Sequence, residues 1–228
     1  MCSLRLANGR IAVTRHPLTA RGLSGRPDLA TLAAAIGALA DHVDARLLFV
    51  DGPQGWKSPE NGLEHCRVCE RELATQGKTG LPGYTKPSNY LAFIRFAIDC
   101  FDELAELGWP RLADPSSLIS SNRHALESFP TSAWRSLGLR PLPGKRKTTP
   151  VSFAATQAAL TKLFELDLPE RLTHDELQAV VAGLAGIAIE RCQPEGYALS
   201  GVAPFLLDGS WREGFIVNPT AKAAAWCS

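Results

Sequence analysis

The sequence predicts an α/β fold in which a mixed β-sheet is flanked by helices. An Asn8-Gly9 pair between two short β-prone runs is typical of a hairpin. The apolar run 47–50 ends at Asp51-Gly52-Pro53, as a buried parallel strand does before a tight turn. Residues 90–107 carry apolar side chains at helical spacing. Strands that alternate with helices in this way are typical of layered α/β folds.

The first half of the chain is expected to form one hairpin, one strand and three helices. In chain order these are a hairpin over 4–14, a helix over 29–43, a strand over 47–50, a short helix over 63–74 and a helix over 90–107. Asp28 stands where a cap for the first of these helices is expected. Residues 52–89 form a long insertion with weak periodicity, and insertions of this length tend to be functional or mobile.

The second half is expected to alternate in the same way. In chain order the elements are a strand over 124–129, a short helix over 131–137, a helix over 151–166, a helix over 173–191 and, over 215–217, either a last strand or a packed extended segment. Thr173 and Glu176 have the spacing of a capping box. With no internal repeat and no low-complexity tract, the chain is interpreted as a single domain over 1–228.

Composition and charge bound the class of protein. Apolar residues make up 45% of the 228 residues and charged residues 21%, which is ordinary for a globular protein. No apolar window is long enough for a membrane span, and the first residues lack the apolar core of a secretory signal. The six cysteines are too sparse for a disulfide scaffold. These observations favour a cytoplasmic protein without membrane contact.

Two local basic stretches stand out against a net charge of only +1. Five arginines and no acid precede Asp28, and Lys145-Arg146-Lys147 forms a second cluster. Both stretches could meet phosphate groups of a nucleic acid. Solvated surface is the alternative interpretation of each.

Three carboxylates are candidates for catalysis by their position. Asp51 ends the first predicted buried strand, Glu127 lies at the end of the second, and Asp175 opens the last helix. Strand ends are where α/β sheets place their sites. Clustered carboxylates are stable together when they share a hard cation such as Mg²⁺, which can activate water for phosphodiester hydrolysis. Each residue also has an alternative structural role. Asp51 could be a turn residue, Glu127 an ion-pair partner, and Asp175 an acid that stabilises the beginning of its helix.

The cysteines permit one further metal hypothesis. His65-Cys66 and Cys69 have the spacing of half a zinc site, which Cys100 or His124 would have to complete. A zinc site at Cys66 and Cys69 is therefore the weakest of the metal-binding hypotheses. The common phosphate-binding, zinc-protease and serine-hydrolase motifs are absent from the sequence. Three tryptophans, Trp56, Trp109 and Trp211, could stack on bases or belong to the core.

Five short segments in a fixed order resemble the domain of unknown function 429 family, regarded as predicted ribonuclease-H-like nucleases. The segments are Phe49-Val50-Asp51-Gly52-Pro53-Gln54-Gly55, Arg67-Val68-Cys69-Glu70-Arg71, Glu127-Ser128-Phe129-Pro130, His174-Asp175-Glu176-Leu177-Gln178-Ala179 and Gly214-Phe215-Ile216-Val217-Asn218-Pro219. Each segment is short, but the resemblance extends over nearly the whole chain from about residue 47 onward. The resemblance implies a five-stranded mixed sheet with helices on both faces.

The resemblance also implies a metal-dependent nuclease. Asp51 and Asp175 would bind Mg²⁺ or Mn²⁺, and Glu127 would complete the catalytic set. The residues expected to contact nucleic acid are Arg67, Arg71, Lys145, Arg146 and Lys147.

Two departures from the family lead to a second hypothesis. Enzymes of this fold carry an Asp on the first strand, and here no acid precedes Asp28, so that strand is expected to be missing. Its loss would leave open sheet edges, which another copy of the chain could fill in a homo-oligomer. Gln178 stands where the family's last helix usually has Asp. The alternative to a nuclease is therefore a non-catalytic ribonuclease-H-like module that binds nucleic acid or a protein.

Overall fold

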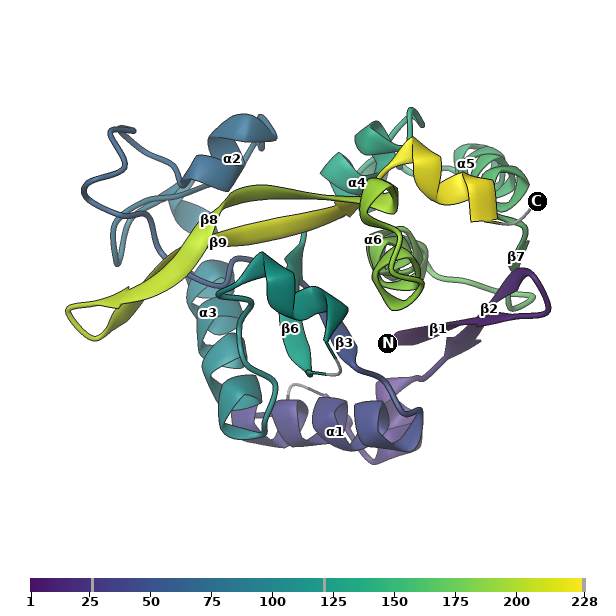
Figure 1. The fold of residues 1–228 in the computed structure, drawn as a ribbon, viewed down its shortest axis with the longest axis horizontal. Coiled ribbons are helices and arrows are strands. Elements are labelled where there is room, and N and C mark those ends of the chain that lie inside the picture. Colours follow the sequence, from purple (N-terminus) through teal and green to yellow (C-terminus); the bar gives the residue numbers. More distant parts are fainter. Residues whose placement is uncertain (26, 121, 227–228) are drawn as a thin grey trace. The chain divides into compact units, whose positions relative to one another are not determined.

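We describe the protein from a computed structural model, which covers residues 1–25, 27–120 and 122–226, with the side chains of 224–226 left out. The fold is mixed α/β, as the sequence predicts, and it divides into two compact units that are each described by themselves (Figure 1). Unit 1 comprises Met1–Gly22, Phe129–Ala198 and the chain from Asn218 onward, and unit 2 comprises Leu23–Ser128 and Leu199–Val217. Within the residues described, no helix combines the length and the apolar character needed to cross a membrane.

Unit 1 contains a three-stranded sheet in the order β1-β2-β7. Its strands are β1 (Cys2–Ala7), β2 (Arg10–Arg15) and β7 (Leu166–Asp167). Asn8 and Gly9 have φ angles of 51° and 77°, the left-handed conformation that a tight two-residue hairpin turn requires. β1 and β2 are antiparallel and β7 joins β2 in parallel, so the predicted hairpin is confirmed.

The helices of unit 1 pack around α6. They are α4 (Pro130–Ser136), α5 (Pro150–Phe164) and α6 (His174–Glu190), with 3₁₀ turns η1 (Leu18–Arg21), η4 (Lys145–Lys147), η5 (Pro194–Gly196) and η6 (Ala221–Trp226). Thr173 and Glu176 form the predicted capping box, each side chain accepting the main-chain N–H of the other residue. Leu177 and Leu184 of α6 are buried with Trp134 in one apolar core.

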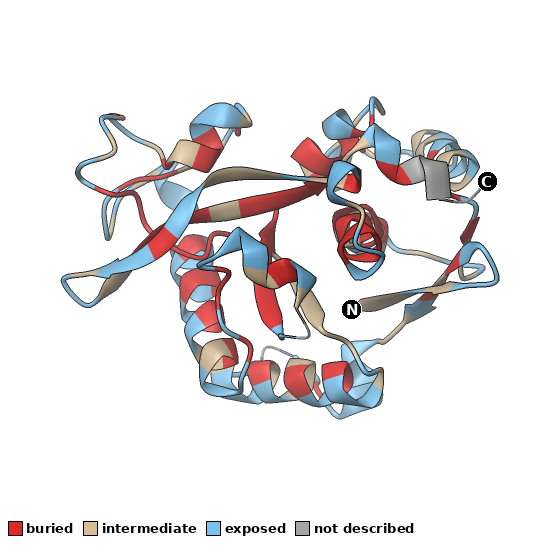
Figure 2. Ribbon diagram, in the orientation of Figure 1, coloured by how far each residue is buried: buried red, intermediate tan, exposed pale blue. Residues whose placement is uncertain are grey.

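Unit 2 is built on a four-stranded sheet in the order β3-β6-β9-β8. Its strands are β3 (Leu47–Asp51), β6 (His124–Ser128), β8 (Tyr197–Leu207) and β9 (Ser210–Pro219). β3 and β6 are parallel from Leu47 opposite His124 to Asp51 opposite Ser128, and β9 pairs with β6 in parallel. All of β6 is buried (Figure 2). The carboxyl ends of β3 and β6 therefore meet at one edge of the sheet.

Two helices and an insertion complete unit 2. The helices are α1 (Leu29–His42) and α3 (Leu91–Glu106), and the insertion carries α2 (Val68–Glu72), β4 (Lys78–Thr79), β5 (Thr85–Lys86) and η2 (Ser88–Tyr90), with η3 (Pro115–Ile119) beyond α3. Asp28 accepts the main-chain N–H of Thr31 at 2.9 Å, so the predicted cap of α1 is confirmed. Phe101 and Trp109 are buried with residues of α1 and β6 in the core of this unit.

The structure differs from the sequence prediction in several places, and the short strands β4, β5 and β7 are among the elements that were not predicted. The predicted hairpin and the strand 47–50 lie in separate sheets rather than one mixed sheet, and β1 and β3 each stand at the end of a sheet order. The helix expected over 63–74 is only Val68–Glu72, because it begins after Arg67 and Ala74 already has a left-handed φ of 48°. The segment 215–217 belongs to the longer strand β9, whose partner β8 was not predicted.

Candidate functional site

Asp51 and Glu127 lie at the ends of the neighbouring strands β3 and β6, as predicted, but on different faces of the sheet. The register places Val50 opposite Glu127 and Asp51 opposite Ser128. Side chains alternate between faces along a strand, and directly paired positions share a face. Asp51 is therefore on the face of Ser128, whereas Glu127 is on the other. The two carboxylates do not form a pair that fits one shared cation.

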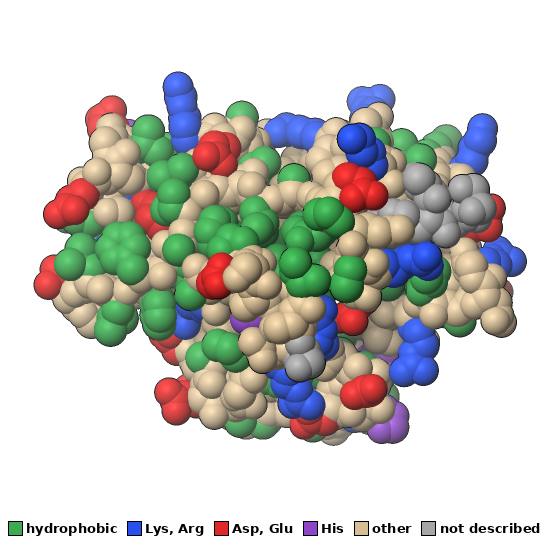
Figure 3. Space-filling model, in the orientation of Figure 1, with side chains coloured by type: hydrophobic (Ala, Val, Ile, Leu, Met, Phe, Trp, Pro, Cys, Tyr) green, Lys and Arg blue, Asp and Glu red, His purple; other side chains and the backbone are tan. Residues whose placement is uncertain are grey.

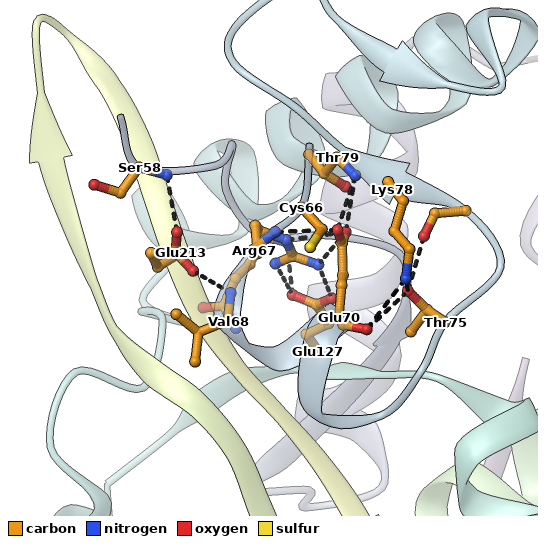
Figure 4. A network of polar contacts seen from close by, with 12 residues as sticks. Ser58, Cys66, Arg67, Val68, Glu70, Thr75, Lys78, Thr79, Glu127 and Glu213 are labelled. Carbon is orange, nitrogen blue, oxygen red and sulfur yellow. Dashed lines mark hydrogen bonds and ion pairs between the residues drawn. The ribbon is translucent and has the colours of Figure 1, made fainter. Parts of the chain in front are cut away.

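Glu127 is bound by Arg67 in a buried ion-pair network (Figure 4). Arg67 Nη1 donates to Glu127 Oε2 at 2.8 Å and Nη2 donates to Oε1 at 2.6 Å, which is the bidentate arrangement of a strong arginine–carboxylate pair. The main-chain N–H of Gln54 also donates to Oε2, at 3.0 Å. Arg67 is 1% exposed and Glu127 3%. Both oxygens of Glu127 are thus already satisfied inside the protein.

Glu70 binds the other edge of the Arg67 guanidinium and ties it to the insertion. Arg67 Nε and Nη2 both donate to Glu70 Oε1 at 3.2 Å. The main-chain N–H of Thr79 lies 3.1 and 2.9 Å from the two oxygens of the same carboxylate. One buried guanidinium consequently joins α2, β4 and β6.

Glu213 on β9 fixes the beginning of the insertion with a second buried carboxylate. Its Oε1 accepts from the main-chain N–H of Ser58 at 2.8 Å and from Asn61 Nδ2 at 2.6 Å. Its Oε2 accepts from the main-chain N–H of Val68 at 2.9 Å. The segment between Ser58 and Val68 is therefore held against the sheet without an apolar core of its own.

The pKa shifts in this network indicate that its residues stabilise the fold. Burial opposes the charge of Arg67, but the acidic groups around it raise its pKa well above the ordinary value. Burial raises the pKa of Glu127, against the opposing pull of Arg67. Burial likewise raises the pKa of the Cys69 thiol well above its usual range, so this cysteine is no nucleophile at neutral pH.

The arginines expected to contact nucleic acid in unit 2 have different surroundings. Arg71 is exposed on α2. Arg67 is enclosed, and its guanidinium N–H groups donate to Glu70 and Glu127. A phosphate cannot reach these donors, so the structure assigns Arg67 to the buried network and leaves Arg71 as the surface candidate.

Asp175 lies in the first turn of α6, in unit 1, where its carboxylate is already engaged. Lys145 Nζ donates to Oδ2 at 2.6 Å, and His174 Nδ1 lies 3.2 Å from Oδ1. The hydrogen bond from Lys145 is the main cause that lowers the pKa of Asp175. Gln178 Oε1, the other oxygen on this helix considered for a cation, accepts from Trp134 Nε1 at 2.7 Å. Asp175 is therefore paired with Lys145 at the surface, and Gln178 is bound to Trp134.

The basic cluster Lys145–Lys147 forms the 3₁₀ turn η4 and is exposed along its whole length. Two main-chain N–H groups, of Lys147 and Thr148, donate to the carbonyl of Gly144 at 2.7 and 3.1 Å. His174 Nε2 lies 2.8 Å from the carbonyl of Pro143 and anchors the loop to α6. Lys145 forms an ion pair with Asp175, and among the described residues this is the single ion pair of the three cations. The turn is an ordered basic surface.

The zinc hypothesis finds no third ligand at the cysteine pair. Cys69 is fully buried beside Arg67, and Cys66 is partly buried. Across residues 1–25, 27–120 and 122–226, no group of three or more His, Cys, Asp or Glu is placed to hold a metal ion.

Two of the three tryptophans belong to the core, one of the alternatives that the sequence left open, and two network residues were missed by sequence reasoning. Trp56 and Trp109 are buried in apolar clusters. The guanidinium carbon of Arg111 lies 4.7 Å from the centroid of the Trp211 ring, which is a cation–π contact. Glu70 and Glu213 were missed as network residues, although Glu70 stands inside one of the segments that carry the family resemblance and Glu213 directly precedes another. Their position in those segments was the available signal.

Comparison of this chain with protein-family models, with curated proteins and with solved structures returns no match.

Proposed function

We propose that this protein is a nucleic-acid-binding module of ribonuclease-H-like type whose predicted carboxylates do not work as a metal-dependent nuclease centre. The observation that carries the proposal is the ordered turn Lys145–Lys147, in which three adjacent cations are exposed on a fixed backbone. Lysine and arginine clusters of this kind are what neutralises the phosphate backbone in sequence-independent binding.

The ion pair between Lys145 and Asp175 does not prevent phosphate binding. Both side chains are 67% exposed, and exposed pairs of this sort contribute about 0–1 kcal/mol. A polyanion that offers several phosphates to the turn can therefore compete with one solvated carboxylate.

The contacts of the predicted catalytic residues support binding without cleavage. Both oxygens of Glu127 are bound by Arg67 inside the protein, and Asp175 is paired with Lys145 at the surface. A buried carboxylate whose charge an arginine already neutralises, as in Glu127, is a poor ligand for a second cation. The ribonuclease-H-like assignment itself rests on the ordered segments of the sequence, and a cytoplasmic location is part of the same proposal.

The test is a fluorescence-anisotropy titration of a labelled oligonucleotide at several salt concentrations in EDTA. We expect the wild type to bind, and the logarithm of its binding constant to fall linearly with the logarithm of the salt concentration. In a Lys145→Ala, Arg146→Ala, Lys147→Ala variant the salt dependence should be weaker. The magnitude of the negative slope should decrease by about 2, as expected when three contacts to a single strand are lost.

The matched control is Lys162→Ala, which removes an exposed cation elsewhere in unit 1. It should leave the slope nearly unchanged. Absence of binding by the wild type at low salt would overturn the proposal. Cleavage that needs Mg²⁺ and is lost in Asp51→Asn would favour the nuclease hypothesis in its place.

A further inference from the structure

Exposed aromatic side chains are concentrated in one short stretch of unit 2. Five aromatic residues in the described part of the chain are exposed, and four of them lie between residues 84 and 96. Their exposed fractions are 73% for Tyr84, 43% for Tyr90, 51% for Phe93 and 37% for Phe96. The fifth is Phe205 on β8, at 40%, where further hydrophobic side chains also reach the surface (Figure 3).

The stretch folds so that the turn carrying Tyr84 packs against the beginning of α3. The main-chain N–H of Gly80 donates to the carbonyl of Tyr84, which closes the turn between β4 and β5. A Cβ on Gly77 would lie 3.0 Å from the Tyr90 ring, and one on Gly83 would lie 3.8 Å from Arg95 Nη2. The β4–β5 turn therefore lies over the first turns of α3, where Tyr90, Phe93 and Phe96 follow one another at spacings of three residues.

The charged residues within this stretch are all basic, and Asp51 and Asp99 lie beside it. Between Glu72 and Asp99 the sequence has no acidic residue, whereas it has Lys78, Lys86 and Arg95. Lys78 Nζ donates to a main-chain carbonyl and to a threonine hydroxyl, so these two bonds leave its charge uncompensated.

The surface borders the end of β3. A Cβ on Gly52 would lie 3.4 Å from the tip of the Phe93 ring. Gly52 directly follows Asp51, so the aromatic side chains begin where the strand ends, at the edge where α/β sheets place their ligands.

We propose that this aromatic–basic surface, formed by Tyr84, Lys86, Tyr90, Phe93, Arg95 and Phe96, binds single-stranded nucleic acid by stacking bases on the rings while the cations meet the phosphates. The inference rests on the proposed nucleic-acid-binding function and names its substrate class. Stacking on exposed rings inside a basic surface is the general mode of single-strand binding.

Single strands fit better than duplexes, because the faces of paired bases are covered by their neighbours in the stack and only unpaired bases can lie on an aromatic ring. A protein partner is the other class of ligand for exposed rings. The absence of acidic residues from 73 to 98 and the presence of Lys86 favour the polyanion, because interfaces between proteins are depleted in lysine.

The experiment compares Tyr84→Ala and Phe93→Ala with the wild type by fluorescence anisotropy. The probe is a labelled oligothymidine of about 16 nucleotides, the upper end of what one such surface covers, in EDTA at low salt. Each variant should weaken binding by roughly 5- to 150-fold, the measured range for one lost stacking contact. Tyr84→Phe should retain wild-type affinity, because stacking needs the ring and not the hydroxyl group.

The matched control is Phe205→Ala, which removes an exposed ring outside this surface and should leave affinity unchanged. Thermal melting of every variant checks that the fold is intact. Equal losses in Phe205→Ala and Phe93→Ala, or equal affinity for the single strand and the corresponding duplex, would overturn the inference.

The failure of this inference is distinguishable from the failure of the proposed function. If the wild type binds and only the Lys145–Lys147 variant is impaired, the function stands and this surface is not its site. If the wild type binds no oligonucleotide, the proposed function and this inference are both overturned. If in addition the wild type self-associates and Tyr84→Ala does not, the surface is an interface between proteins.

Discussion

Replacing Arg67 by methionine should destabilise unit 2 far more than the loss of a surface arginine. The substitution keeps most of the unbranched stem but removes the guanidinium that lies between Glu70 and Glu127 (Figure 4). Both carboxylates would then be buried without a cation.

The magnitude follows from the four hydrogen bonds that Arg67 makes and from their burial. Two are to Glu127 at 2.6 and 2.8 Å, and two are to Glu70 at 3.2 Å. Removing one partner of a buried pair costs about 3–5 kcal/mol, because the remaining charge is uncompensated. For a chain of this size that corresponds to a decrease in melting temperature of roughly 6–20 °C.

The pH dependence of this loss has a definite sign. Burial raises the pKa of Glu127 already in the wild type, and without Arg67 the pKa must rise further. A folded state that binds a proton more tightly than the unfolded state loses stability as pH rises through this range. The deficit of Arg67→Met should therefore be largest at neutral pH and should shrink as pH falls towards 5.

The assay is urea unfolding followed by tryptophan fluorescence at pH 7 and at pH 5. Arg123→Met is the matched control, because Arg123 is 44% exposed and its ion pair with Asp41 lies at the surface. Arg123→Met should lower the free energy of unfolding by about 1 kcal/mol or less. Equal losses in the two variants, or a deficit of Arg67→Met that grows on acidification, would refute the interpretation of a closed buried network.

Two further predictions concern groups outside this network. Glu176 accepts from the main-chain N–H of Thr173 at 2.7 Å and from Arg15 at 2.8 Å, and these bonds lower its pKa below the ordinary value although burial opposes them. Glu176→Gln should therefore lower the free energy of unfolding by about 1 kcal/mol at neutral pH. Melting curves should show this difference vanishing as the pH falls through the lowered pKa of Glu176, and a difference that stays constant would contradict this. Burial raises the pKa of the Cys100 thiol to about 11, whereas Cys192 is exposed, so thiol labelling of the native protein, mapped by mass spectrometry, should modify Cys192 and spare Cys100 until the protein unfolds. Similar labelling rates for the two cysteines would argue against this environment.

The elements that the sequence predicts correctly are those fixed by local chemistry. The Asn8-Gly9 hairpin, the Asp28 cap and the capping box at Thr173 each depend on residues within a few positions of one another. β8 could not be predicted in this way, because Gly201 and Pro204 interrupt its pattern and it is stabilised by pairing with β9. The hairpin and β3 belong to two different sheets because β2 pairs with β7 and β3 pairs with β6, and these partners are distant in the sequence.

The candidate site was predictable in position but not in chemistry. Asp51 and Glu127 do end neighbouring strands. Whether they face one another depends on the strand register, which places them on opposite faces. The partner of Glu127 is Arg67, 60 residues away in the chain, and no local pattern indicates that a buried arginine will neutralise a predicted catalytic carboxylate.

The aromatic–basic surface had a signal in the sequence that a search for core residues passes over. Leu91, Ile94 and Ile98 follow the buried side of α3, whereas Phe93 and Phe96 fall outside that pattern. Large apolar residues off the core-facing side of an amphipathic helix are therefore informative about ligand binding.

The proposed function requires that nucleic acid binds without a metal and is not cleaved. The most direct measurement is an anisotropy titration of the labelled single strand in EDTA and again in Mn²⁺, with the oligonucleotide from both titrations then resolved on a denaturing gel. We predict equal affinity in the two buffers and an intact oligonucleotide throughout. Binding that requires Mn²⁺, or an oligonucleotide shortened by the wild type but not by Asp51→Asn, would contradict the claim.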